Sequence, residues 1–306
     1  MTPRRSRMHR TRTSKHLALT PRDLEIFKAL CRYRHLRSTY LHAFVGGESE
    51  KRFKERLGDL FHEGYLDRPT EQWRFADSRC LPVVHELGKG GREVLTATAV
   101  PVPGAIMWLR NGPYRQFEHS LMTCEVLASI ELEMRERPDL RFIPWPEILA
   151  KAPEGTRRAD RPYQLPAGDG LASVTPDAIF GIEYQRDGRK VFRFFAFEAD
   201  RATMPIVRTS GNGTSYLSKL ASYRYILARD SHRVRLGIPN LLVLTVTTDQ
   251  ARCDELVRRF DEQNGEGPQY LFRAVGNGFA TFARPLQALL VQPWERPGLP
   301  PLRIDQ

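Results

Sequence analysis

Two apolar runs on either side of a turn, with acidic residues beside them, constrain the fold of this 306-residue chain most strongly. The first run follows Asp177, the second ends at Glu198 and Asp200, and Asp187-Gly188 lies in the break between the runs. An Asp-Gly pair between apolar runs is a common signal for a β-hairpin. Side chains alternate between the two faces of a strand, so Glu198 and Asp200 are expected on one face. The sequence therefore predicts a hairpin that gathers three carboxylates at one edge of a sheet.

Carboxylates gathered in this way repel one another unless a cation lies between them. Oxygen-rich clusters suit hard divalent ions. Asp177, Glu198 and Asp200 are therefore candidate ligands for Mg²⁺ or Mn²⁺. Each also has a purely structural alternative. Asp177 can be a turn residue before a strand, Glu198 a surface acid at a strand end, and Asp200 a cap for the loop that follows.

The charge of the chain favours a polyanionic partner. The net charge is +11 and the pI is about 9.7, a balance that suits double-stranded DNA through phosphate contacts and counterion release. The alternative is a charge that only keeps the protein in solution. Residues 1–16 hold six Lys or Arg and no acid, so we expect residues 1–18 to be a flexible basic arm.

The same sequence argues against a membrane protein and against a zinc site. Its apolar runs fall well short of the roughly 20 residues of a membrane helix, and the first residues lack the apolar segment of a secretory signal. The four cysteines are far apart and form no CxxC pair, a pattern that indicates reduced thiols. We therefore expect a cytoplasmic protein.

Residues 19–97 show three amphipathic helical segments followed by two strand-like segments. The helical segments are residues 19–34, 38–44 and 50–63, and the strand-like segments are 65–68 and 81–87. This order predicts a winged helix-turn-helix whose third helix enters the major groove of DNA. Candidate DNA contacts on that helix are Lys51, Arg52 and Lys54, with Arg56 nearer the core boundary. The alternative is a solvated face on a winged domain that binds protein.

A second domain is expected at residues 113–295, after a linker at 98–112 and before a tail at 296–306. Its expected order is a long helix, a strand, the two hairpin strands, a helix that carries Lys219, and an apolar strand at residues 240–246. Later strands are expected at residues 270–274 and 279–282. On the long helix, Glu125 is expected to be a charge on the helix face, with metal binding as its alternative.

This order, with Asp177 and Glu198 on adjoining strands, resembles the PD-(D/E)XK nuclease superfamily, whose αβββαβ core holds metal at one sheet edge. Pro176-Asp177 would be the PD element, and Glu198-Ala199-Asp200 stands where (D/E)XK belongs, with Asp in place of Lys. The superfamily sometimes supplies its lysine from the next helix, so Lys219 is the candidate for that part.

The resemblance implies metal-assisted hydrolysis of a phosphodiester. An ion on Asp177 and Glu198 would lower the pKa of a bound water. Lys219 would orient that water or neutralise the developing charge. Asp200 is a candidate second ligand, and Arg201 is a candidate contact to the DNA backbone. Lys219 can instead be a solvated helix lysine.

A second resemblance covers about residues 19 to 295. Its most specific piece is E-x-D-R-x-T at Glu198–Thr203, followed by K-x3-Y at Lys219 and Tyr223. With Tyr33-Arg34-His35-Leu36, the stretch His85–Arg92, His119-Ser120-Leu121 and Pro176-Asp177-Ala178, it resembles the replication-relaxation family. These are bacterial proteins of plasmids and integrated mobile elements. The family usually has Gly where this chain has Ala202.

Two functions remain open at this point. The resemblance implies a winged DNA-binding domain fused to a nuclease-like domain, with a role in replication or mobilisation of the element and with other proteins of those processes as partners. The joint presence of Asp177, Glu198, Asp200 and Lys219 favours a metal-dependent endodeoxyribonuclease. The missing lysine of the motif favours a non-catalytic DNA-binding regulator or replication accessory. A protein-binding adaptor that uses the winged domain is a third alternative.

Overall fold

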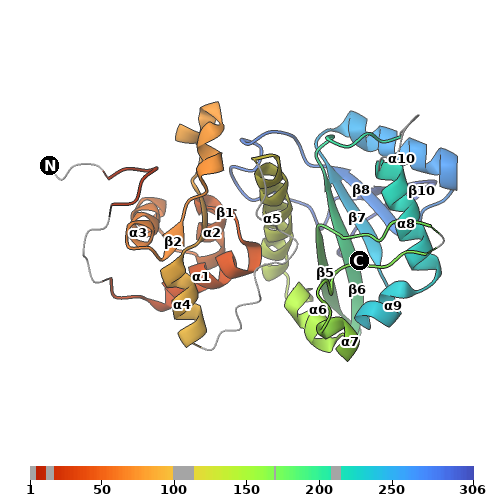
Figure 1. Ribbon diagram of the computed structural model, residues 1–306, viewed down its shortest axis with the longest axis horizontal. Helices are drawn as coiled ribbons and strands as arrows, with labels where there is room; N and C mark the ends of the chain where they lie inside the picture. Colours follow the sequence, from red (N-terminus) through yellow and green to blue (C-terminus); the bar gives the residue numbers. More distant parts are fainter. Residues whose placement is uncertain (1–4, 12–16, 99–113, 169, 208–214) are drawn as a thin grey trace. The chain divides into compact units, whose positions relative to one another are not determined.

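The computed structural model of the chain describes residues 5–11, 17–98, 114–168, 170–207 and 215–306 (Figure 1). It divides into two compact units. The first comprises Met1–Leu132 with Gly278–Gln287, and the second comprises Glu133–Asn277 with Ala288–Gln306. Except for Thr98, the expected linker lies outside the described residues. Helix α5 (Tyr114–Arg135) carries the chain from the first unit into the second.

The first unit contains the three helices and the two later strands that the sequence predicts, together with one short strand that it does not predict. Its elements are α1 (Pro21–Tyr33), β1 (Leu36–Arg37), α2 (Ser38–Val45), α3 (Glu50–His62), β2 (Leu66–Asp67), the 3₁₀ turns Thr70–Arg74 and Ala76–Arg79, β3 (Val84–Leu87) and α4 (Lys89–Ala97). In the described chain, β1, β3 and β2 form an antiparallel sheet in that order.

Local signals set the starts of α1 and α3. The Thr20 hydroxyl accepts from the backbone N–H of Asp23, whose carboxylate accepts from the backbone N–H of Thr20, which is a capping box. The Ser49 hydroxyl caps α3 by accepting from the backbone N–H of Arg52. The apolar faces that follow these caps meet in the core of the unit, where Phe27, Leu41, Phe53, Leu57 and Leu60 are buried.

The described part of the basic arm lies against the first unit. Arg5 forms an ion pair with Asp59 of α3, and Arg10 forms one with Asp67 of β2. The Arg7 guanidinium donates to two backbone carbonyls, those of Arg79 and Leu81. Residues 5–11 thus contact α3, β2 and the segment that precedes β3.

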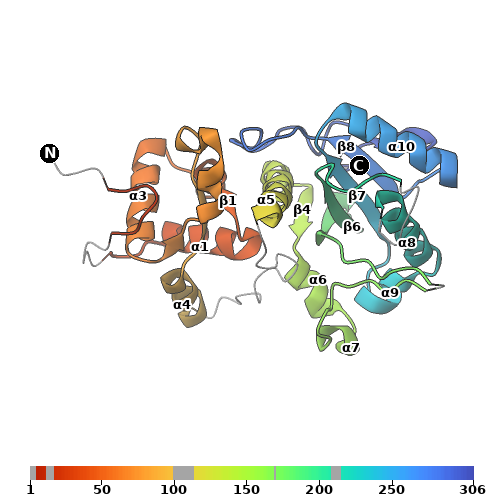
Figure 2. The same cartoon turned by 45° about the horizontal axis from the view of Figure 1, so that its top comes forward.

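The second unit is built on a mixed sheet (Figures 1 and 2). In the described chain the strand order is β10-β9-β8-β7-β6-β5-β4. The strands are β4 (Leu140–Ile143), β5 (Ala178–Arg186), β6 (Arg189–Asp200), β7 (Leu242–Thr247), β8 (Tyr270–Ala274), β9 (Trp294–Arg296) and β10 (Leu299–Leu302). Strands β6, β7 and β8 are parallel, and the other neighbouring pairs are antiparallel.

Five helices accompany this sheet in the described chain. They are α6 (Trp145–Lys151), α7 (Glu154–Arg157), α8 (Tyr216–Ala228), α9 (Ser231–Leu236) and α10 (Gln250–Asn264). Helices α8 and α10 lie along the same side of the sheet in both views (Figures 1 and 2). In the described part of the chain, every helix falls short of the length and apolar character that crossing a membrane requires.

The predicted hairpin is confirmed. Asp187 and Gly188 both have positive φ angles, 49° and 72°, which is the conformation that a two-residue type I′ turn needs. Strands β5 and β6 pair with Ala178 opposite Phe197. This register brings the residue before β5, Asp177, next to Glu198.

Two expectations about the C-terminal part are wrong. Residues 279–282 form turns instead of a strand. The tail at 296–306, which was expected to lie outside the second domain, supplies β10, and Ile304 is fully buried. Three prolines and a glycine within residues 297–301 hide the strand signal, because proline is usually depleted in strands.

Candidate functional site

The site begins at the C-terminal end of β6, where β5 holds Asp177 beside Glu198. The backbone N–H of Asp177 donates to the Phe197 carbonyl at 3.0 Å. In return, the backbone N–H of Ala199 donates to Asp177 Oδ2 at 2.9 Å. Asp177 is half-buried and Glu198 is 1% exposed. One bond thus holds the Asp177 backbone and the other holds its carboxylate next to Glu198.

Helix α8 supplies the partners of Glu198. Ser215 and Ser218 form a capping box that starts the helix. Lys219 and Tyr223 are four residues apart and so share one face. The Lys219 ammonium group donates to Glu198 Oε2, and the Tyr223 hydroxyl donates to Glu198 Oε1. Both oxygens of the Glu198 carboxylate are thus bonded to side chains of one helix.

Burial controls the electrostatics of this group. Burial raises the pKa of Glu198 to about 7, although the Lys219 charge acts to lower it. Burial also acts to lower the pKa of Lys219, but the carboxylates of Glu198 and Asp177 outweigh it, so that pKa lies above its usual value. Lys219 therefore stays charged at neutral pH, while Glu198 gains or loses its proton near pH 7.

Asp200 has a different partner. It lies two residues after Glu198, but its carboxylate forms a bidentate pair with Arg252 of α10, with Nε–Oδ2 at 2.7 Å and Nη2–Oδ1 at 3.3 Å. Its Oδ1 also accepts from the backbone N–H of Ala202 at 3.1 Å. Ala202 has a φ of 56°, in the region that favours glycine. These contacts fit the alternative role of Asp200, a cap for the loop after β6.

The predicted three-carboxylate metal set does not fit this geometry. Among the described residues, no group of three or more His, Cys, Asp or Glu side chains is placed to hold a metal ion. Asp177 and Glu198 together fit a smaller site, because Mg²⁺ commonly uses one or two carboxylates and completes its shell with water and substrate phosphate. Asp200 does not join these two acids in one group, and its carboxylate is paired with Arg252.

The predicted DNA contacts of α3 divide into two groups. Lys51, Arg52 and Lys54 are exposed, and Lys54 forms a surface pair with Glu50 at 2.9 Å. Arg56 instead points to α1, where its guanidinium bonds both oxygens of Asp23 at 3.0 and 2.6 Å.

Arg56 therefore helps to hold α1 against α3, and its charge is already matched by a buried acid. Arg201 is in the second unit, half-buried in the loop after β6.

The sequence reasoning missed two residues of the site. Tyr223 belonged to the K-x3-Y piece but received no role, although its spacing from Lys219 places it on the same face of a helix. Arg252 could not have been found, because it lies 52 residues after Asp200 and no local pattern joins them.

A comparison with protein families places these residues in a known context. A family model described as replication-relaxation matches residues 27–241, from within α1 to the residue before β7. The matched stretch contains α3, Asp177, Glu198, Asp200 and Lys219. No curated protein and no solved structure matches the chain.

Proposed function

The chain belongs to the replication-relaxation family, and from this premise we propose that it is a DNA-binding protein that acts in the replication or mobilisation of a plasmid or integrated mobile element. The observation that carries the proposal is the basic exposed face of α3, with Lys51, Arg52 and Lys54. The net charge of +11 also favours binding to a polyanion such as DNA.

The arrangement around α3 supports a winged helix-turn-helix assignment. Helices α2 and α3 are separated by a short turn at Gly46 and Gly47, both with positive φ. Strands β2 and β3 follow α3 and pair as an antiparallel wing. In such a domain the helix after the turn enters the major groove, and its exposed side chains contact bases and phosphates. The pair between the half-buried Arg56 and the buried Asp23 keeps α3 against α1 while the basic face stays in solvent.

The test is DNA binding by the Arg52→Ala/Lys54→Ala variant. We expect its affinity for duplex DNA to fall by about tenfold or more, because both cations that it removes face solvent on α3. Fluorescence anisotropy with a labelled duplex at fixed salt measures the effect.

The matched control, Lys28→Ala/Lys89→Ala, removes the same charge from α1 and α4 and should change the affinity by less than about threefold. If both double variants bind DNA as the unchanged protein does, α3 is not the reading helix.

A second candidate function, metal-dependent DNA nicking, is favoured by the contact between Lys219 and Glu198 beside Asp177. When the short helices α6, α7 and α9 are left aside, the chain order α5, β4, β5, β6, α8, β7 resembles the αβββαβ order of the PD-(D/E)XK superfamily. Lys219 comes from the helix after the hairpin, which is the alternative source of the lysine in that superfamily.

Each residue of this group would have a definable part in hydrolysis. A Mg²⁺ or Mn²⁺ ion held by Asp177 and Glu198 would supply an activated water at neutral pH. The bond from the backbone N–H of Ala199 would hold the Asp177 carboxylate in place before substrate arrives. Lys219 keeps its charge at neutral pH and can stabilise the negative charge that develops on the phosphate.

Nicking of supercoiled plasmid tests this second function. With Mg²⁺ or Mn²⁺ present, we expect nicking by the unchanged protein and a loss of about 100-fold or more in Asp177→Asn, which keeps the shape of the side chain but removes its charge.

The control is Asp187→Asn, an acid of the same hairpin that lies in the exposed turn. If the protein binds DNA but nicks it with neither ion, the catalytic assignment fails. The non-catalytic regulator then stands, an alternative that the Asp200–Arg252 pair already favours.

A further inference from the structure

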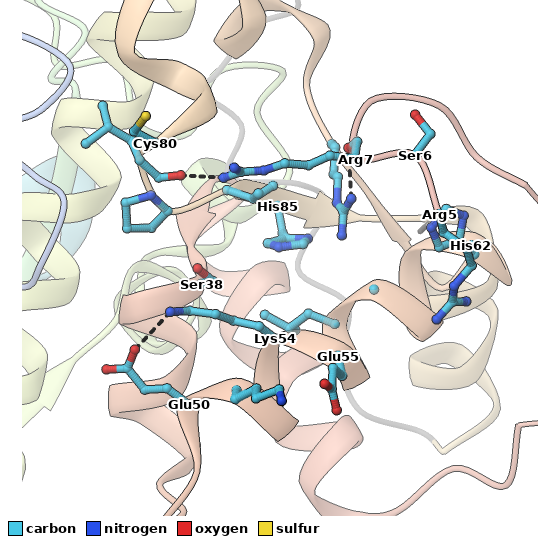
Figure 3. A pocket seen from close by; sticks show the side chains of 17 residues that line it. Arg5, Ser6, Arg7, Ser38, Glu50, Lys54, Glu55, His62, Cys80 and His85 are labelled. Atoms are coloured by element: carbon cyan, nitrogen blue, oxygen red, sulfur yellow. Dashed lines mark hydrogen bonds and ion pairs between the residues drawn. The ribbon is translucent and has the colours of Figure 1, made fainter. Parts of the chain in front are cut away.

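A cavity of about 800 Å³ lies within the first unit, apart from the carboxylate site. Its walls are α3, the residues that lead into β3, and the described part of the N-terminal arm (Figure 3). Small-molecule sites in proteins occupy roughly 300–1,000 Å³. The cavity is therefore large enough for a ligand of the size of a nucleotide.

The charged residues of the cavity give it an excess of positive charge. Five Lys or Arg residues line it, against the two acids Glu50 and Glu55. Glu50 is paired with Lys54, and Arg5 is paired with Asp59 of α3, so two of the five cations already have an acidic partner. The basic lining residues are Arg5, Arg7, Lys51, Lys54 and Arg68. This balance suits an anion.

The buried His85 and the half-buried Arg68 on the cavity wall each have a hydrogen-bonding atom without a partner. His85 is 1% exposed, and its Nδ1 has no hydrogen-bond partner. Figure 3 shows its ring between Arg7 and Lys54. Arg68 stacks on Phe61 at 4.1 Å, and its Nη1 donates to the Arg7 carbonyl at 2.8 Å, but its Nε has no partner. Buried polar atoms in folded proteins nearly always have partners, so these two positions indicate a missing one.

The pKa values of Arg68 and His85 also indicate a missing anionic partner. Burial, followed by the charges of Arg7 and Arg5, lowers the pKa of Arg68 to about 10. Burial, followed by the charges of Arg68 and Arg7, also lowers the pKa of His85 well below its usual value. A bound anion would offset the repulsion among the guanidinium groups of Arg5, Arg7 and Arg68.

The remaining wall is apolar. It is formed by Leu57, Leu81, Pro82 and Val83. A ligand that matches both walls carries phosphate at one end and a flat, weakly polar group at the other. Nucleoside phosphates have this chemistry.

We propose that this cavity binds the phosphate group of a nucleotide, with Arg68 and His85 as the phosphate contacts and the apolar wall against the base. The cavity shares Lys51 and Lys54 with the proposed DNA-contacting face of α3, but the proposed phosphate contacts Arg68 and His85 lie outside that helix. The phosphate can come from a free nucleotide or from a DNA strand that enters the cavity.

Binding of a fluorescent ATP analogue to the full chain, with inorganic phosphate as competitor, tests the proposal. We expect Arg68→Gln to weaken binding by about tenfold or more, the loss of one charge-assisted hydrogen bond. Arg68→Lys, which restores the charge, should recover part of the affinity. Lys89→Gln, which removes an exposed charge from α4 outside the cavity, should leave binding within about twofold of the unchanged protein.

A parallel titration with duplex DNA distinguishes the two sources. If the ATP analogue does not bind but the duplex affinity falls by about tenfold in Arg68→Gln and in His85→Phe, the phosphate belongs to DNA. If neither titration responds to Arg68→Gln in a variant that keeps its melting temperature, the proposal is overturned. Arg52→Ala, outside the cavity, should weaken DNA binding alone, so that failure of the α3 assignment is recognised separately.

Discussion

Replacing Lys219 by methionine is expected to destabilise the second unit by about 3–5 kcal/mol at about pH 8, and by much less at about pH 5. The change leaves the Glu198 carboxylate buried without its cation. Its pKa, already raised to about 7 by burial, should rise further.

The sign follows from proton linkage. The pKa of Glu198 is higher in the folded state, about 7, than its usual 4.5. The folded protein therefore loses stability as the pH rises from 4.5 through 7, because the buried carboxyl must lose its proton. Removal of Lys219 extends this loss above pH 7. Chemical denaturation of the unchanged and variant proteins at both pH values measures the effect.

Two further variants make the test specific. Lys219→Met/Glu198→Gln, which removes the buried charge, should recover much of the stability at about pH 8. Lys151→Met breaks the exposed pair with Glu147 and should cost less than about 1 kcal/mol at either pH. An equal loss in Lys219→Met at both pH values would show that the Glu198 charge is not the cause.

Replacing Arg37 by methionine is expected to destabilise the first unit by about 3–5 kcal/mol at about pH 9. Arg37 Nη1 lies 2.9 Å from Glu125 Oε2, and both side chains are fully buried. Arg37 also donates to the carbonyl of Phe279. Burial raises the pKa of Glu125 to about 8, although the charge of Arg37 acts to lower it.

The loss should again shrink as pH falls, because a protonated Glu125 needs no cation. Thermal or denaturant unfolding at about pH 9 and about pH 6 measures it. Arg37→Met/Glu125→Leu should be clearly more stable than Arg37→Met, since it leaves no unpaired charge inside. If the double variant is no more stable than Arg37→Met, the loss of stability does not come from the unpaired charge of Glu125.

The hairpin and its two acids could be predicted because their signals are local. Alternating side chains and the Asp187-Gly188 turn fix which residues face each other. That register is enough to bring Asp177 beside Glu198. Lys219 was named from a family pattern, and the structure places it in contact with Glu198.

The rest of the site depends on partners far away in the chain. Asp200 bonds Arg252, Arg56 bonds Asp23, and Glu125 bonds Arg37. A charge on a helix looks the same in the sequence whether it faces solvent or a buried partner. Glu125 was therefore expected on a helix surface, Arg56 was expected to contact DNA, and Asp200 was expected to bind metal.

The salt dependence of duplex DNA binding tests the central claim most directly, because phosphate contacts must weaken as salt rises. If Lys51, Arg52 and Lys54 each neutralise one phosphate, the logarithm of the association constant should fall against the logarithm of salt concentration with a slope of about −3 or steeper. In Arg52→Ala/Lys54→Ala the slope should become shallower by about 2. A binding constant that does not change with salt, or a slope that the double variant leaves unchanged, would contradict the account.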